Sequence, residues 1–421
     1  MRVLISHTNF PAQFRHIAEY LGRSKENQVV FATRTPRAEW VIPGVKKAVF
    51  TPAEAKGEIH PPAHEQDAAM RHGAAMVRLC ERLKRDGFVP DVILGHSGWG
   101  QTLFLRDVFP ETPFVGYFEW YYNADSAEIA FDGRERTLTE RARLRTRNTP
   151  ILHDLASCRV GVTPTAWQRA QFPAEFRPKL MQVHDGINTR YFSPAEGGRL
   201  PAGTLDLPDA DLSGAEELVT YCARGLEPYR GFPDFYKSLP AVLDARPGCH
   251  VLIVGDDRVC YSPKLPDGET YKENARRLVK LDESRVHFTN ALPYGQYRQV
   301  LRASSAHVYL TWPFVLSWSM LEAMSCGCLV VGSDTEPVRE VIRHRENGLL
   351  TDFNSPEKIA EATIDALENQ ADYAALRDRA RQTILDGYCL SRCLPVHLNL
   401  LARLAGAEPP AAGRQPEQGQ P

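Results

Sequence analysis

The chain has 421 residues, of which 43% are hydrophobic and 24% charged, the ordinary composition of a soluble globular protein. Its formal net charge of -2 lacks the strong positive excess that marks nucleic-acid-binding proteins, so we expect no nucleic-acid partner. At about 100–200 residues per domain, this length predicts two domains, each large enough to bury its own core.

The cysteines and the N-terminus both predict a cytoplasmic protein. The 9 cysteines are scattered, and the spacing of Cys326 and Cys328 suits neither a zinc knuckle nor a redox motif, so we expect reduced thiols. Residues 1–5 lead directly into a strand pattern without a signal peptide. No apolar run is long enough to cross a bilayer, so any membrane contact is expected to be peripheral, at the inner face.

The first half of the chain alternates between strand and helix patterns. Apolar or β-branched runs predict strands at residues 2–6, 28–33, 91–95, 113–117 and 159–163. Helical periodicity covers residues 12–21 and 68–86. This alternation predicts an α/β domain with a parallel, doubly wound sheet.

The alternation restarts after a stretch rich in glycine and proline, residues 193–214. Strands are predicted at residues 218–222, 250–254, 286–289, 307–311 and 328–332, and helices at 232–243, 318–325 and 356–367. We therefore divide the chain into an N-terminal domain (1–195), a linker (196–214), a C-terminal domain (215–385), a helical segment that packs back on the N-terminal domain (386–407) and a disordered tail (408–421).

Parallel sheets bind ligands beyond the carboxyl ends of their strands, so we expect functional residues there, along a cleft between the two sheets. The loop after strand 218–222 contains Arg224, Gly225, Arg230 and Gly231. Glycine lets the backbone approach a phosphate, arginine binds its oxygens with charge-assisted bonds, and the next helix N-terminus adds positive potential. Taken alone, a solvated turn with surface arginines is an equally good interpretation.

Glu322 lies on the predicted helix 318–325, which begins shortly after a strand. Its carboxylate can accept hydrogen bonds from sugar hydroxyls. Taken alone, a buried or capping carboxylate that is satisfied by the backbone is the better interpretation.

Arg224, Arg230 and Glu322 together resemble, in order and spacing, the C-terminal half of the retaining glycosyltransferases of family 4, which have the GT-B fold. The resemblance implies two Rossmann-like doubly wound domains that face a central cleft. It also implies that Arg224 and Arg230 act as catalytic residues on the donor diphosphate, and that Glu322 binds the ribose. The implied donor-binding residues further include Gly225, Asn290, Ala291, Leu292, Phe314, Leu316, Ser317, Ser319 and Asp185.

The N-terminal half resembles the family in outline. His96 follows strand 91–95 at the position that lines the sugar site in relatives, which implies a catalytic role, although a hydrogen-bonded structural histidine is the alternative. Glu119 stands among aromatic residues and either positions an acceptor hydroxyl as a catalytic residue or caps the end of a strand. We assign acceptor binding to Asn9, Phe10, Gln13, Glu119 and Trp120.

The chain departs from the family pattern at three places, the first being the interval between the two basic residues, which is one residue longer than usual and ends in Arg230. Relatives commonly carry two glutamates in an E-x7-E arrangement; Glu322 is the second, and Phe314 stands at the first position. The carboxylates that can compensate are Asp185, Glu119 and Asp334. The glycine-rich first loop of the family is replaced by Phe10-Pro11-Ala12.

The resemblance implies transfer of a sugar, with retention of configuration, from a UDP- or GDP-linked donor to a hydroxyl of a glycan, a lipid-linked saccharide or a protein. We expect no cofactor and no metal, because Asp256 and Asp257 are adjacent rather than spaced as D-x-D, and the arginines would neutralise the leaving diphosphate. Two alternatives stay open: a nucleotide-sugar epimerase of the same fold, and a non-catalytic nucleotide-sugar-binding subunit.

A basic stretch contains Arg134, Arg136, Arg141, Arg143, Arg145 and Arg147. Some of these can share one helical face and contact an anionic lipid surface. The interleaved Glu135 and Glu140 favour a solvated helix face instead.

Overall fold

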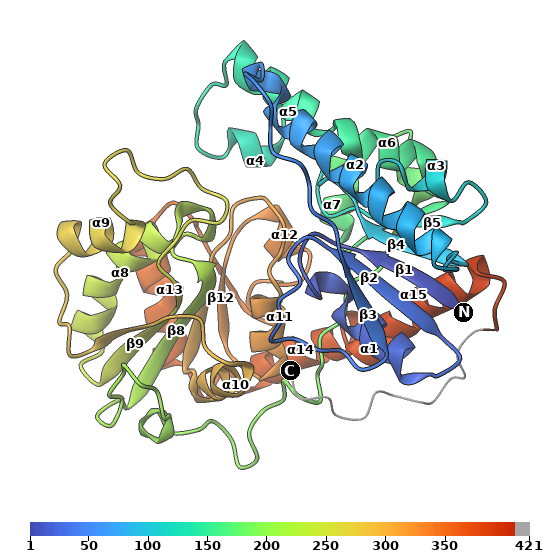
Figure 1. The fold of residues 1–421 in the computed structure, drawn as a ribbon. Coiled ribbons are helices and arrows are strands. Elements are labelled where there is room, and N and C mark those ends of the chain that lie inside the picture. Colours follow the sequence, from blue (N-terminus) through green and yellow to red (C-terminus); the bar gives the residue numbers. More distant parts are fainter. Residues whose placement is uncertain (409–421) are drawn as a thin grey trace. The chain divides into compact units, whose positions relative to one another are not determined.

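The computed structural model describes residues 1–408, and Figure 1 shows its ribbon. All but the first residue of the tail predicted at 408–421 lies outside the described residues. The chain forms two units, each with its own parallel sheet: unit 1 contains Met1–Gly186 and the segment that starts at Ser391, and unit 2 contains Ile187–Leu390.

Unit 1 is built on a seven-stranded sheet in the order β3-β2-β1-β4-β5-β6-β7, with all pairs parallel. Its strands are β1 (Arg2–Ser6), β2 (Gln28–Thr33), β3 (Val45–Val49), β4 (Val92–His96), β5 (Phe114–Tyr117), β6 (Val160–Thr163) and β7 (Leu180–Gln182). All five predicted strands are present. The sequence did not predict β3, which contains two lysines, or β7, which is only three residues long, because edge strands need little apolar sequence.

The helices of unit 1 place an apolar surface on both faces of this sheet. They are α1 (Arg15–Arg23), α2 (His64–Arg85), α3 (Leu105–Val108), α4 (Ala127–Ala130), α5 (Leu138–Arg147), α6 (Thr149–Ser157), α7 (Ala166–Gln171) and α15 (Leu390–Leu404). Met76 and Leu79 of α2 and Leu155 of α6 pack with Leu4 of β1 and Ile93 of β4 in one core cluster. Because all strands are parallel, the loops that follow them lie at the same edge of the sheet.

Unit 2 repeats the plan with a six-stranded parallel sheet in the order β10-β9-β8-β11-β12-β13. Its strands are β8 (Glu217–Gly225), β9 (Cys249–Asp256), β10 (Val286–Thr289), β11 (Ala306–Tyr309), β12 (Val330–Ser333) and β13 (Leu349–Thr351). The five predicted strands are present, β10 with the predicted bounds and the other four with shifted ends, and the three-residue β13 was missed. In both sheets the order reverses beside the first strand, between β1 and β4 and between β8 and β11, and ligands of such sheets bind at this point.

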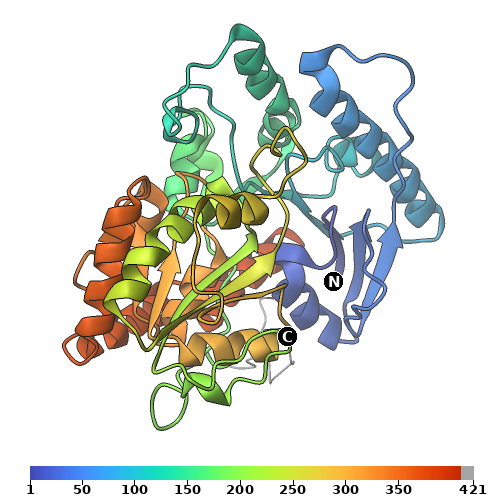
Figure 2. The ribbon, with the colours of Figure 1, turned by 90° about the vertical axis from the view of Figure 1, so that its left-hand side faces the viewer.

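Helices cover both faces of the sheet of unit 2: α8 (Phe232–Ala245), α9 (Tyr271–Leu278), α10 (Tyr294–Ala303), α11 (Trp318–Ser325), α12 (Glu336–Arg339), α13 (Pro356–Glu368) and α14 (Ala374–Gly387). Figure 2 shows α8 and α9 on one side of the sheet and α10 on the other. Met320, Leu321 and Met324 of α11 are fully buried, as the helical pattern predicted. This packing anchors α11, whose first residues point to the carboxyl edge of the sheet.

The chain passes between the units at Gly186/Ile187 and returns at Leu390/Ser391. The segment predicted as linker, 196–214, lies within unit 2, where Leu207 and Leu212 are buried in a core cluster with Leu218. Its glycines and prolines shape an irregular but packed segment rather than a connection between the units. Helix α15 belongs to unit 1, where His397 Nε2 lies 3.1 Å from the carbonyl oxygen of His184.

Gly231 provides a test of the turn between β8 and α8. Its φ of +68° is left-handed, and a Cβ there would lie 2.5 Å from Cβ of Leu310. We expect Gly231→Ala to lower the free energy of unfolding by about 2–4 kcal/mol, through backbone strain and overpacking. Gly295→Ala on α10 is the control, because nothing lies within 4 Å of its added Cβ. Urea denaturation of both variants checks this, and equal midpoints would contradict it.

Candidate functional site

Arg230 is held at the carboxyl end of β8 by groups that follow β11. Its Nη1 donates to Thr311 Oγ1 at 2.6 Å, to the carbonyl of Val315 at 3.2 Å and to Tyr309 Oη at 3.4 Å. The Tyr221 hydroxyl donates to the backbone carbonyl of Arg230 at 2.7 Å. The Arg230 side chain is therefore buried and fixed by neutral oxygens. Among residues 1–408 it forms no direct ion pair with a carboxylate, although the buried Glu227 lies close enough for its charge to raise the pKa of Arg230.

The start of α11 contacts the same hydroxyl group of Tyr309 that binds Arg230. The backbone N–H of Ser317 donates to Tyr309 Oη at 2.8 Å, so one hydroxyl contacts both Arg230 and this helix start. Ser317 is the N-cap, and its Oγ accepts from the N–H of Ser319. The positive end of the helix dipole and the guanidinium of Arg230 thus belong to one connected group, which is a suitable environment for an anion.

Glu322 lies one turn further along α11, with its side chain buried. Its Oε2 accepts a hydrogen bond from Tyr297 Oη of α10 at 3.0 Å. Burial raises the pKa of Glu322 to about 7, and the Tyr297 hydrogen bond opposes this shift. The carboxyl group therefore changes charge near neutral pH, which makes it a candidate binding group rather than a surface acid.

Arg224 differs from Arg230 because it is exposed to solvent at the end of β8. In the described part of the chain its guanidinium pairs with no carboxylate. The next residue, Gly225, allows a close approach to the loop that follows β9, since a Cβ there would lie 2.5 Å from the carbonyl of Arg258. The structure thus places one fixed and one exposed cation in the same loop.

The loop after β10 contains the predicted base-binding residues Asn290, Ala291 and Leu292. The Ala291 N–H donates to Asp256 Oδ1 at 3.2 Å, while Asn290 is exposed and Leu292 packs against a core cluster of unit 2. Asp256 also forms an ion pair with Arg258 at 3.1 Å. Across residues 1–408, no group of three or more His, Cys, Asp and Glu side chains is arranged to hold a metal ion.

Phe314, at the position of the missing glutamate, lies in an aromatic environment. Its ring makes edge contacts with Tyr229 and Tyr261, at centroid distances of 5.6 and 5.3 Å. Leu316, which follows Phe314 closely in the chain, is also buried. Asp334, one compensating carboxylate that the sequence offered, forms an ion pair with Arg339 at 2.6 Å. Sequence reasoning missed the surrounding rings, because they come from separate loops.

Unit 1 gathers several predicted polar residues at the carboxyl ends of β1, β4 and β5. His96 ends β4, and its Nε2 lies 3.5 Å from Glu119 Oε2, a contact too poorly aligned for a hydrogen bond. Gln13 Nε2 donates to Glu119 Oε1 at 2.9 Å. The Tyr117 hydroxyl donates to Asp185 Oδ1 at 2.8 Å. The structure therefore brings the predicted residues His96, Glu119, Gln13 and Asp185 to one edge of the sheet of unit 1.

His7 packs edge-on against His96, with ring centroids 4.7 Å apart. Its Nδ1 accepts from the N–H of Asn9 at 2.8 Å. Burial holds the pKa of His7 well below its usual range, and the neighbouring His96 adds to this effect. His7 is therefore neutral at physiological pH and serves as a hydrogen-bonding group beside His96.

Phe10 and Trp120, assigned to acceptor binding, are both buried. Phe10 contacts Phe31 at a ring distance of 4.8 Å and lies under the Lys47 ammonium. The Trp120 indole N–H donates to Glu128 Oε2 at 2.9 Å. With 1% and 5% of their surfaces exposed, these side chains belong to the packing of unit 1, and their contact with an acceptor stays a prediction.

A buried acid that the sequence did not suggest lies on α6. Asp154 Oδ2 accepts from Ser97 Oγ at 2.7 Å and Thr102 Oγ1 at 2.6 Å, while Oδ1 has no partner within residues 1–408. Burial raises the pKa of Asp154 to about 7, and the two hydroxyls and His96 oppose this shift. A single aspartate in a helix gives no sequence signal, so only the fold reveals that it supports the loop after His96.

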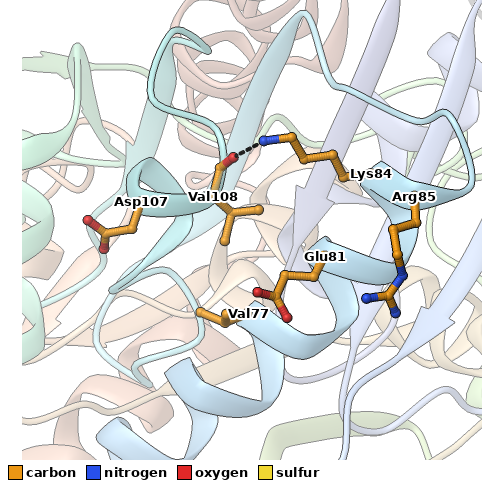
Figure 3. A pocket seen from close by; sticks show the side chains of 6 residues that line it. All are labelled: Val77, Glu81, Lys84, Arg85, Asp107 and Val108. Atoms are coloured by element: carbon orange, nitrogen blue, oxygen red, sulfur yellow. Dashed lines mark hydrogen bonds between the residues drawn. The ribbon is translucent and has the colours of Figure 1, made fainter.

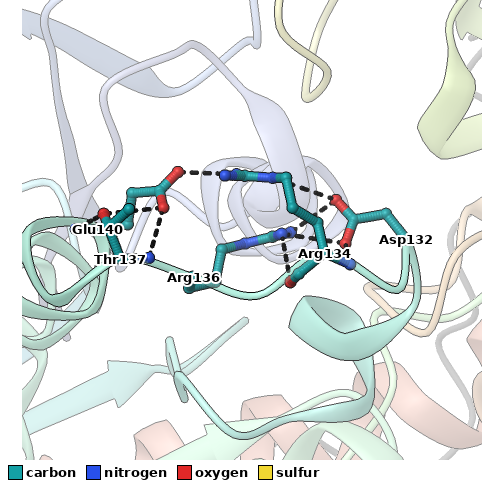
Figure 4. A network of polar contacts seen from close by, with 5 residues as sticks. All are labelled: Asp132, Arg134, Arg136, Thr137 and Glu140. Carbon is teal, nitrogen blue, oxygen red and sulfur yellow. Dashed lines mark hydrogen bonds and ion pairs between the residues drawn. The ribbon is translucent and has the colours of Figure 1, made fainter.

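The basic stretch around α5 is largely paired with acids. Figure 4 shows Arg134 and Arg136 between Asp132 and Glu140, with ion pairs of 2.7 Å (Arg134–Glu140) and 2.8 Å (Arg136–Asp132). Arg141 pairs with Asp125 and Arg143 with Glu65. These pairs reduce the positive charge available to a lipid surface. They agree with the interpretation of this stretch as a solvated helix face. None of the helices within residues 1–408 is both long and apolar enough to cross a membrane.

Figure 3 shows a surface hollow in unit 1 between α2 and α3. It is lined by Val77, Glu81, Lys84, Arg85, Asp107 and Val108. Two acids and two bases balance each other, and Lys84 Nζ donates to the carbonyl of Val108 at 3.1 Å. None of the predicted site residues lines this hollow.

The arrangement of both sheets matches solved structures with the GT-B fold. Anabaena HepE in complex with UDP and glucose has a TM-score of 0.69 at 13% identity, over 96% of this chain and 100% of that chain. Sucrose-phosphate synthase from Thermosynechococcus elongatus has a TM-score of 0.70 at 18% identity, over 97% and 99%. The predicted GT-B fold is therefore confirmed.

Residues 25–192 match the glycosyl transferase family 4 group, and residues 208–383 match glycosyl transferases group 1. The chain belongs to the family 4 glycosyltransferases, as its motifs predicted. Among curated relatives, an uncharacterized glycosyltransferase of Methanocaldococcus jannaschii is 27% identical over 32% of this chain and 36% of its own length.

A second relative is a GDP-mannose-dependent monoacylated alpha-(1-6)-phosphatidylinositol monomannoside mannosyltransferase of Corynebacterium glutamicum. It is 24% identical over 47% of this chain and 50% of its own length. The matches thus span between about a third and half of the length of these relatives.

The raised pKa of Asp154 predicts a pH-dependent contribution to stability. The folded state binds the proton more tightly than the unfolded chain, so this contribution is lost as pH rises from about 4 to about 7. We expect Asp154→Asn to gain stability relative to the wild type as pH rises from about 5 to about 8, as measured by thermal denaturation.

Asp91→Asn is the control for this measurement. Arg2 and its backbone N–H hold the pKa of Asp91 below its usual range, so its contribution is already complete at pH 5. The difference between Asp91→Asn and the wild type should stay constant over the same pH range. A constant difference for Asp154→Asn as well would contradict the prediction.

Proposed function

We propose that this protein transfers a sugar from a nucleotide-sugar donor to an acceptor hydroxyl, with retention of anomeric configuration and without a metal ion. The observation that carries the proposal is the pair of cations after β8. Arg230 is buried without a carboxylate partner in the described chain, and Arg224 is exposed beside it. HepE, with which the chain shares its fold, is described in complex with UDP-glucose, and one relative is GDP-mannose-dependent, so both UDP and GDP donors fit.

In this proposal the pyrophosphate lies between the two arginines and the N-terminus of α11. As the bond to the sugar breaks, negative charge grows on the departing diphosphate, and fixed cations in a partly buried site stabilise it strongly. Arg230 is held by three hydrogen bonds, so it needs no reorganisation when this charge develops. The arginines then supply the stabilisation that a metal gives elsewhere, since Asp256 pairs with Arg258 and Asp257 accepts a hydrogen bond from Thr270.

Glu322 is assigned to the ribose hydroxyls, and the polar group of unit 1 to the acceptor. The Glu119 carboxylate is accessible, with 32% of its side chain exposed, and it can accept a hydrogen bond from an acceptor hydroxyl. The acceptor is a glycan, a lipid-linked saccharide or a protein. The 9 cysteines all lie among the described residues and form no disulfide there, which fits a reducing, cytoplasmic compartment.

A non-catalytic nucleotide-sugar-binding subunit is the second candidate, because Phe314 replaces the first glutamate of the family pattern. Incubation of the protein with a nucleotide sugar and candidate acceptors decides among the possibilities. Transfer yields a glycosylated acceptor, an epimerase yields a new nucleotide sugar without an acceptor, and a binding subunit leaves the donor intact.

Removal of the exposed cation tests donor binding without disturbing the core. We expect Arg224→Ala to raise the Kd for UDP or GDP at least tenfold, since a charge-assisted hydrogen bond contributes about 1.5–3 kcal/mol. Arg343→Ala, which removes another exposed arginine of unit 2, should leave the Kd unchanged. Titration calorimetry in EDTA measures this. Equal Kd values for both variants, or loss of binding in EDTA, would contradict the proposed site.

The pKa of Glu322 predicts that donor affinity depends on pH. Only the ionised carboxylate accepts hydrogen bonds from both ribose hydroxyls, so affinity should increase as pH rises through about 7. Glu322→Gln should weaken binding about tenfold at pH 8 and remove most of the pH dependence. Calorimetry with an intact nucleotide sugar suits this test, because its pyrophosphate diester does not titrate near pH 7. Parallel pH profiles of the affinity for wild type and variant would contradict the assignment of Glu322 to the ribose hydroxyls.

A further inference from the structure

Four aromatic side chains form a connected group at the carboxyl edge of the sheet of unit 2. Tyr229 follows β8, Tyr261 follows β9, and Trp312 and Phe314 follow β11. Tyr229 stacks on Trp312 with ring centroids 4.4 Å apart and an angle of 20°. Phe314 presents its edge to Tyr229 and Tyr261. We call these four residues the aromatic wall.

The aromatic wall adjoins the arginine assigned to the pyrophosphate. The Cζ atom of Arg230 lies 5.3 Å from the centre of the Tyr261 ring, a cation–π distance. Tyr261 nevertheless keeps 41% of its surface exposed, which is unusual for a large aromatic side chain within a cluster. Tyr261 therefore offers exposed surface to a ligand that also reaches Arg230.

Glu227 holds Tyr261 in this place. This glutamate is completely buried, and its Oε2 accepts hydrogen bonds from three consecutive backbone N–H groups, of Cys260 at 2.8 Å and of Tyr261 and Ser262 at 2.9 Å. The Tyr229 N–H donates in turn to Ser262 Oγ at 3.1 Å. A buried carboxylate is costly unless it is well bonded, and here it fixes an exposed tyrosine on a loop far from it in sequence. The wall is therefore a defined arrangement rather than an incidental exposure of rings.

The order in which ribose, pyrophosphate and sugar are linked in a nucleotide sugar determines which of these parts can contact the aromatic wall. The pyrophosphate lies between the ribose and the sugar, so a group adjacent to Arg230 contacts one of these two. Under the proposed function Glu322 takes the ribose, on α11, where its partner is Tyr297 of α10. The wall, on the other hand, contains Phe314, which stands where a carboxylate would otherwise meet the sugar.

We propose that the aromatic wall binds the transferred sugar by stacking, with Tyr261 as its contact residue and Glu227 as the positioning residue. This inference rests on the proposed function and names its substrate class: donors whose pyranose ring presents an apolar C–H face. Aromatic faces bind such surfaces through dispersion and burial of apolar area, and they need no carboxylate contact to a sugar hydroxyl. Specificity then comes from the shape of the ring face rather than from hydrogen bonds to one hydroxyl pair.

The test compares each nucleotide with its sugar derivative: UDP with UDP-glucose, and GDP with GDP-mannose, by titration calorimetry. We expect Tyr261→Ala to weaken binding of the nucleotide sugar about tenfold and to leave binding of the nucleoside diphosphate unchanged. Tyr261→Phe keeps the ring and should bind both ligands like the wild type. Leu278→Ala, which removes another exposed apolar side chain of unit 2, is the matched control and should change neither.

Glu227→Gln tests the positioning role, because it keeps the side-chain volume and one oxygen acceptor but loses the charge. It should reproduce the selective loss of nucleotide-sugar affinity in a weaker form, whereas a purely structural role would lower both affinities alike. Equal loss for both ligands in Tyr261→Ala would place the ring on the nucleotide and overturn the inference, as would no loss at all. A wild-type protein that binds none of the four ligands would refute the proposed function itself.

Discussion

The site of unit 2 depends on the burial of one guanidinium group. Arg230 donates hydrogen bonds to neutral oxygens of Thr311, Tyr309 and the backbone of Val315, and the nearby carboxylate of Glu227, whose charge raises the pKa of Arg230, forms no direct ion pair with it in the described chain. A buried cation without a carboxylate partner is costly, and a protein that keeps one retains a strong attraction for an anion. The same contacts connect the β8–α8 turn to the start of α11, so the charge and the helix N-terminus are fixed together.

Parallel topology explains why residues distant in the sequence act as one group. Each strand delivers its following loop to the same edge of the sheet, so Tyr229, Tyr261 and Phe314 meet although they belong to three different loops. The same rule gathers His96, Tyr117 and Glu119 in unit 1. In both units the core packing of the helices leaves this edge to polar and aromatic side chains, and the candidate site residues lie there.

Burial also sets the titration behaviour of the candidate groups. Glu322 and Asp154, each with a pKa raised to about 7, change charge near neutral pH, while His7 stays uncharged. Asp154 contacts the loop after His96 through Ser97 and Thr102, so its ionisation is linked to the geometry of that loop. The two carboxyl groups therefore have different consequences: Glu322 belongs to the proposed donor site, whereas Asp154 is expected to act on stability.

The sequence alone determined the fold class, most strands and the family, because apolar periodicity and the Arg224/Arg230/Glu322 spacing are local properties. It missed the short or charged edge strands β3, β7 and β13, and it placed a linker in residues 196–214, which pack within unit 2. Only the tertiary structure decided that Glu227 positions Tyr261, that Asp154 lies beneath the loop after His96, and that the basic stretch around α5 is paired with acids. The contacts of Glu227 and Asp154 join residues far apart in the chain, and no local pattern encodes a distance of that kind.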